Sequence, residues 1–100
     1  MLVNVFFDEE LTDIDVIDIP QAVLEDINNV QQMFFDWLFN KNNNHEYWIC
    51  VGGVKKYCSY RAEAFVEWLN NYYLEDSKEK ALGVTMYDTN IDFNRPKISF

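Results

Sequence analysis

The sequence predicts one α+β domain, in which two helices pack on one face of a small, mainly antiparallel or mixed sheet with a central β-hairpin. A chain of 100 residues fits one domain, and its 49% hydrophobic content excludes a disordered chain. Short runs of β-branched and aromatic residues alternate with two longer stretches that show helical spacing. A Gly-Gly pair separates the two middle runs, as in a tight hairpin.

The first two elements are expected to be short strands. Residues 1–7 are mostly β-branched or aromatic and predict a strand. Residues 13–17 alternate, with Ile14 and Val16 on one face and Asp13 and Asp15 on the other. Because aspartate disfavours central positions in a sheet, this segment predicts a half-buried edge strand.

The first helix is expected to begin just after Asp18 and to run to about Asn40, with Gln21 at the capping-box position. Asp18 can cap its first turn, and Pro20 fits there because a first turn needs no bonded N–H. The pair Asn28-Asn29 is its weakest point, and any break is expected there. Apolar residues at helical spacing form one buried stripe: Val23, Ile27, Val30, Phe34 and Leu38.

Residues 46–51 and 54–60 are expected to form the hairpin around Gly52-Gly53, because glycine reaches the positive φ angles of such a turn. With a two-residue turn, Val51 faces Val54 and Ile49 faces Lys56. Cys50 and Cys58 then lie on opposite faces, which argues against a disulfide between them.

The second helix is expected from about Tyr60 to Glu75, with Ser59 as its N-terminal cap. Its apolar residues keep helical spacing, while glutamate and asparagine occupy the outer face. Residues 84–88 and 98–100 are predicted to complete the sheet.

The net charge of −9 is distributed unevenly along the chain. Residues 1–40 hold nine carboxylates and no lysine or arginine, whereas residues 41–100 hold eight acids and eight bases. This asymmetry predicts a negative face that attracts a basic protein surface and repels nucleic acid and anionic membranes. The alternative is a solvated acidic rim that the later lysines and arginines partly neutralise. The carboxylates expected to meet a partner are Asp8, Glu9, Glu10, Asp13, Asp15 and Asp18.

Six of the seven residues from Met33 to Phe39 are large and apolar, and they point in every direction around the helix axis. A single core covers a stripe only a little over ~100° wide. Either the helix is enclosed within the domain or it exposes aromatic anchors. We favour complete burial. The alternative is a partner or homodimer interface in which Phe35, Trp37 and Phe39 make the apolar contacts.

No motif points to a catalytic residue, a metal site or a cofactor. His45, Cys50 and Cys58 match no zinc-binding spacing. Residues 88–92 resemble the opening of a calcium loop, but Phe93 stands where the turn needs glycine and Ser99 where the loop needs glutamate. Lys55 and Lys56, the one basic pair, make too small a patch for nucleic acid in so acidic a chain.

The expected location is the cytoplasm. No stretch approaches the ~18 consecutive apolar residues of a membrane span, and the N-terminal segment has no basic region of a signal peptide. Two cysteines are too few for a disulfide scaffold and suit a reducing compartment.

These observations favour a small, acidic, non-enzymatic inhibitor that docks on a basic protein, such as one that handles nucleic acid. The chain resembles anti-restriction and anti-CRISPR proteins of phages and mobile elements in its size, its acidity and its many residues that AT-rich codons encode. It shares no motif with them. An immunity protein or antitoxin, a homodimeric structural or adaptor protein, and an unrecognised enzyme are the alternatives.

Overall fold

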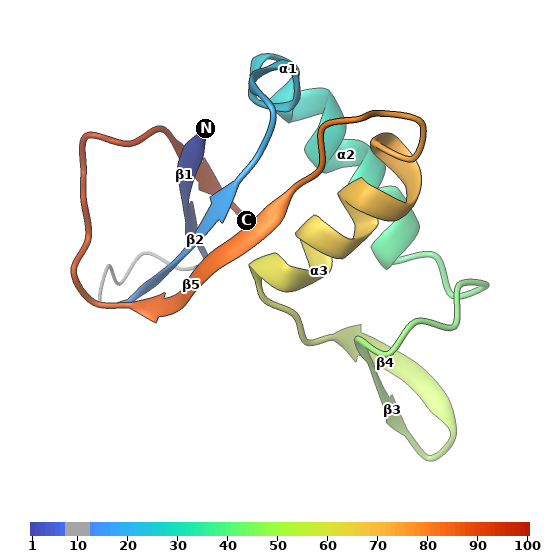
Figure 1. Cartoon of the computed structure of the whole chain (residues 1–100). Coiled ribbons are helices and arrows are strands. Elements are labelled where there is room, and N and C mark those ends of the chain that lie inside the picture. The colour runs from blue at the N-terminus through green and yellow to red at the C-terminus, as the bar shows by residue number, and fades with distance from the viewer. Residues whose placement is uncertain (8–12) are drawn as a thin grey trace.

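The structure is a computed structural model that describes residues 1–7 and 13–100. It has the predicted α+β class, with a mixed four-stranded sheet and a separate two-stranded sheet (Figure 1). The elements in chain order are β1 (Leu2–Phe6), β2 (Ile14–Asp18), α1 (Gln21–Glu25), α2 (Ile27–Leu38), β3 (Trp48–Val51), β4 (Val54–Cys58), α3 (Ala62–Trp68), the π-helical turn η1 (Leu69–Tyr73), β5 (Leu82–Asp88) and β6 (Lys97–Ser99).

The main sheet has the strand order β5-β2-β1-β6. β2 pairs antiparallel with both β1 and β5, whereas β1 and β6 run parallel. β2 is therefore an inner strand, and its residues 14–17 are all buried. The prediction that this segment forms a half-buried edge strand is wrong.

The sheet buries β2 because it is covered on both faces. On one face Ile17 belongs to the main core with Val3 and Val5. On the other, Ile14 and Val16 pack with Phe6 beneath residues of the loop that follows β5. Ile14 and Val16 share one face of the sheet, as predicted. Asp15 lies on the other face with Ile17, and it is buried because the main core covers that face.

The first predicted helix is two helices. The chain leaves helical geometry at Asp26, where φ is −115° and ψ is 27°, two residues before the predicted break at Asn28-Asn29. The prediction that Asp18 caps the first helix is wrong. Asp18 belongs to β2, and its carboxylate accepts a hydrogen bond from the N-terminal amine at 2.6 Å.

The core between the helices and the main sheet is largely aromatic. Phe34 of α2 is fully buried, and its ring centroid lies 5.3 Å from that of Phe65 in α3 and 5.7 Å from that of Trp68. The predicted complete burial of residues 33–39 is wrong, because Phe39 is 51% exposed and Met33 is 42% exposed. The buried stripe of α2 covers only the face that meets α3 and the sheet.

The hairpin β3–β4 extends from one end of the molecule and forms its own sheet, so it is not the centre of the main one (Figure 1). Val51 faces Val54 as predicted, but an extra residue in β4 places Tyr57 opposite Ile49. This bulge shifts the rest of the register by one residue. Cys58 then lies opposite Trp48 and on the same face as Cys50, so the prediction of opposite faces is wrong; both cysteines are free.

The second predicted helix begins two residues late and changes geometry near its end. Ser59 does not cap it; the N–H of Ala62 donates instead to the Asp15 carboxylate of β2 at 3.0 Å. After Trp68 the helix continues as η1, which the N–H of Leu74 closes on the carbonyl of Leu69 at 2.6 Å. A π turn accommodates one additional residue, and such turns are frequent at functional sites.

Candidate functional site

Three of the six carboxylates that the sequence predicts as a docking face lie in the described residues, and all three pair with a cation of the chain. Asp8, Glu9 and Glu10 lie outside the described residues. Asp13 and Asp15 both pair with Arg61, and Asp18 pairs with the N-terminal amine. Each described member of the set therefore already has a positive partner within the chain.

Asp15 is a structural carboxylate. It is fully buried and accepts hydrogen bonds from Arg61 Nε at 3.1 Å and Nη2 at 2.5 Å, and from the backbone N–H groups of Ala62 and Tyr87 at 3.0 and 3.1 Å. Burial raises the pKa of Asp15, but the hydrogen bonds from Arg61, Ala62 and Tyr87 and the charge of Arg61 together hold the pKa below its ordinary value. The carboxylate thus joins β2 to α3 and β5, and it is not available to a partner.

Tyr87 completes this arrangement. Its φ of 55° is uncommon for a residue other than glycine, and the β2–β5 ladder is irregular at Asp15. The Arg61 guanidinium lies 4.1 Å from the ring centroid of Tyr87 and 5.1 Å from that of Phe7. Asp15 and Arg61 are therefore enclosed between two aromatic rings and three main-chain segments.

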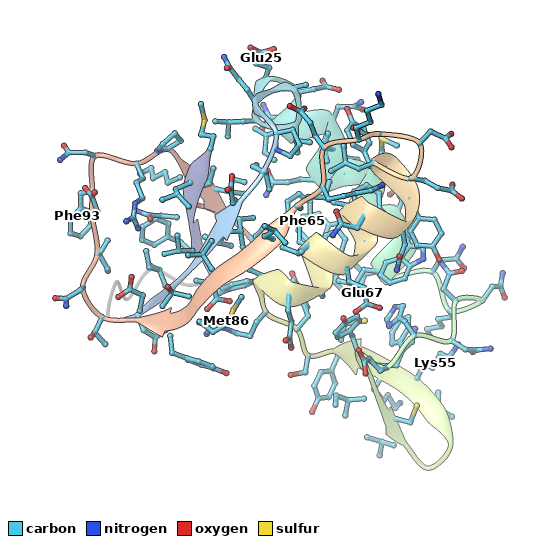
Figure 2. All side chains as sticks on the ribbon, in the orientation of Figure 1. Glu25, Lys55, Phe65, Glu67, Met86 and Phe93 are labelled. Carbon is cyan, nitrogen blue, oxygen red and sulfur yellow. The ribbon has the colours of Figure 1, made fainter. Side chains whose placement is uncertain are left out.

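A second group of carboxylates lies on α3 and in the segment before β3, beside the hairpin. Glu46, Glu63 and Glu67 are exposed, and within residues 1–7 and 13–100 no lysine or arginine forms an ion pair with them. They border two adjoining hollows of about 540 and 430 Å³, with Glu46, Tyr47 and Glu67 lining both. Figure 2 shows Glu67 on the side of α3 toward the hairpin.

The larger hollow, here called the aromatic hollow, has a wall of five rings: Trp37, His45, Tyr47, Trp68 and Tyr72. The ring centroids of Trp37 and His45 are 4.6 Å apart, and those of Trp37 and Tyr72 are 5.7 Å apart. Tyr72 belongs to η1, so the π turn helps to form this wall. Asparagines complete the lining: Asn42, Asn43, Asn44 and Asn71.

Tyr47 fixes the position of Glu67. Its hydroxyl donates a hydrogen bond to Glu67 Oε2 at 2.7 Å. Burial raises the pKa of Tyr47, and the Glu67 carboxylate raises that pKa further. Tyr47 therefore stays a neutral donor, and Glu67 enters the hollow as an oriented carboxylate with one oxygen left to accept.

His45 supports the wall of the hollow. Its Nε2 lies 2.8 Å from the carbonyl oxygen of Leu38, and its Nδ1 accepts the N–H of Tyr47 at 3.2 Å, so both ring nitrogens have backbone partners. The ring also stacks on Trp48 at 5.4 Å. In the described part of the chain, no three His, Cys, Asp or Glu side chains are placed to hold a metal ion.

The three predicted apolar contacts separate. Trp37 lines the aromatic hollow, whereas Phe35 is half-buried and stacks on Phe39 at 5.9 Å, outside the residues that line it. One face of the hairpin adds exposed apolar side chains that the sequence analysis did not identify: Ile49, Val51, Val54 and Tyr57. A homodimer stays a prediction.

No protein-family model, curated protein or solved structure matches this chain. In the residues that the structure describes, no helix has the length and apolar character needed to cross a membrane.

Proposed function

We propose that this chain is a non-enzymatic protein that binds a basic surface of another protein with its hairpin end. The supporting observation is that Glu46, Glu63 and Glu67 gather around two hollows and form no ion pair with any described lysine or arginine. This keeps the acidic docking expected from the sequence and moves it from the first 18 residues to the region between the hairpin and α3.

Concave surfaces lined by charge of one sign concentrate the electrostatic potential and steer oppositely charged partners. Glu63 and Glu67 stand four residues apart on α3, and like charges at this spacing repel by a few tenths of a kcal/mol. A lysine or arginine from a partner removes that repulsion. Complementary charges of this kind contribute chiefly to association rate and specificity.

The composition of the aromatic hollow does not match a site with a serine, threonine or cysteine nucleophile. The residues that line it include none of these three types, and its histidine has backbone partners at both nitrogens. Such a nucleophile needs an adjacent base to activate it.

Occupying a basic surface inhibits any partner that uses the surface to hold nucleic acid, so inhibition of a nucleic-acid-handling protein is the role we propose. A cytoplasmic location belongs to the same proposal.

The test compares three immobilised forms of the chain in an extract of the cells that produce it. One is the wild type, one carries Glu46→Gln, Glu63→Gln and Glu67→Gln, and the control neutralises three exposed carboxylates of the loop after η1: Glu75→Gln, Asp76→Asn and Glu79→Gln. The wild type and the control should retain the same basic protein, and the hairpin-end variant should lose it.

The retained protein is then purified and its affinity measured at rising salt. Affinity should fall steeply for the wild type and much less for the hairpin-end variant. Equal retention by all three forms, an acidic retained protein, or no protein enriched by the wild type over the hairpin-end variant would each refute the proposal.

A further inference from the structure

The aromatic hollow has a composition that distinguishes it from an acidic patch. Its wall of rings belongs to α2, to the segment before β3, to α3 and to η1, so segments far apart in the sequence assemble it. The rings of Trp37 and Tyr72 contact each other at 5.7 Å, and Tyr72 is 55% exposed. Aromatic rings that line a hollow attract cations through the negative potential of their faces.

The carboxylates of the hollow point to the same ligand class. Glu67 is oriented by Tyr47 at 2.7 Å and keeps an unused acceptor oxygen, and Glu46 lines the same hollow. Lys55, a cation of the neighbouring hairpin, does not fill it. Its Nζ donates to the carbonyls of Lys41 and Asn43 and to the side-chain oxygen of Asn44, so it is held by two residues of the lining and forms no ion pair with Glu46 or Glu67. A purely apolar ligand would remove water from the carboxylates without replacing its hydrogen bonds, which is costly.

We propose that the aromatic hollow binds the guanidinium group of an arginine side chain presented by a protein partner. This inference rests on the proposed function and adds the side chain that the partner contributes. A guanidinium is planar, stacks on aromatic rings and donates two parallel hydrogen bonds to a carboxylate, whereas a lysine ammonium is a compact and strongly hydrated charge.

The same combination already occurs inside this fold. Arg61 donates through two nitrogens to Asp15 while its guanidinium lies 4.1 Å from the Tyr87 ring centroid. In the aromatic hollow, Glu67 and the rings of Trp37 and Tyr72 supply the equivalent carboxylate and aromatic surface. The difference is that the chain provides no arginine of its own among the described residues there.

The test uses N-acetyl-arginine amide as the probe and N-acetyl-citrulline amide, its uncharged analogue of the same shape, as the control. The indole N–H resonances of Trp37 and Trp48 are followed in the folded protein by NMR. The arginine probe should shift the Trp37 resonance saturably, with the Trp48 resonance, whose N–H donates to Asn43, changing less. Citrulline should bind at least about tenfold more weakly.

Two variants locate the effect. Tyr72→Leu and Glu67→Gln should each weaken binding of the arginine probe by about three- to tenfold, because each removes one of the two attractions. Both positions are exposed, so folding should be retained. Glu75→Gln in the loop after η1 is the matched control and should leave binding unchanged.

The outcomes separate this inference from the proposed function. Equal binding of citrulline, tighter binding of N-acetyl-lysine amide, or the absence of saturable binding would overturn the arginine site, while salt-dependent capture of a basic protein would still support acidic docking. Arginine binding that persists while all three forms of the chain retain the same proteins would overturn the proposed function and leave the arginine site in place.

Discussion

The two ends of this molecule treat acidic side chains in opposite ways. At the sheet end, the fold surrounds Asp15 with one arginine and two backbone N–H groups, and no part of the carboxylate reaches solvent. At the hairpin end, Glu46 and Glu67 border a hollow and form no ion pair with any described lysine or arginine. The comparison shows that the number of carboxylates in a segment does not reveal their role. Their role depends on whether the fold places a cation next to them.

This difference has an energetic consequence. A buried carboxylate depends on its partner, because losing that partner leaves a charge or a donor without compensation in a medium of low dielectric. An exposed carboxylate keeps its water and contributes little to stability. Mutations at the two ends should therefore affect different measurements: the free energy of unfolding at Asp15, and partner binding at Glu46 and Glu67.

The largest effect is expected at the sheet end. Asp15→Asn keeps the shape of the side chain but removes the charge that Arg61 faces, and it turns an amide N–H₂ toward donors. It should lower the free energy of unfolding by about 3 kcal/mol, measured by urea denaturation at pH 7.

Asp13→Asn is the control for that measurement. Asp13 is 39% exposed at its side chain and lies 3.5 Å from Arg61, so its loss should cost less than about 0.5 kcal/mol. If both variants lost the same free energy of unfolding, the burial of Asp15 would not make it more important for stability than Asp13.

The second prediction concerns the free energy of unfolding at low pH. Because the pKa of Asp15 is held below its ordinary value of 3.8 in the folded protein, the unfolded chain takes up this proton first as the pH falls. The stabilisation is complete above 3.8 and disappears as the pH falls through the lowered pKa of the folded state. The difference in unfolding free energy between wild type and Asp15→Asn should therefore be constant near neutral pH and shrink in acid. A difference that grows in acid would contradict this assignment.

The sequence was informative where one short segment decides the structure. The glycine pair placed the hairpin turn, and helical spacing identified the buried stripe of α2 because a local period reports which face meets the core. It could not show that a loop 70 residues later covers the second face of β2, so an alternating pattern was interpreted as an edge strand. The bulge in β4 was not predicted either, because no residue in that strand requires one.

The candidate site was harder to predict because four segments build it: α2, the segment before β3, α3 and η1. Trp37 was named among the apolar contacts, but His45 and Tyr47 lie just before β3 and Tyr72 lies in a π turn, and no spacing in the sequence connects them. The charge imbalance between the first 40 residues and the rest did not reveal that Arg61, from the second half, pairs with Asp13 and Asp15. Pairing between distant residues is what a linear count of charge omits.

The smallest effect on stability is expected at the hairpin end, and it sharpens the comparison most. The double variant Glu46→Gln and Glu67→Gln removes two negative charges, one of which repels Glu63 along α3, and weakens the hydrogen bond from Tyr47. These effects oppose each other, so the free energy of unfolding should stay within about 0.5 kcal/mol of the wild type in the same urea experiment. Binding of the arginine probe should nevertheless fall, because the charge it meets is gone. A loss of stability as large as that of Asp15→Asn would mean that these carboxylates hold the fold together, and the distinction between the two ends would no longer stand.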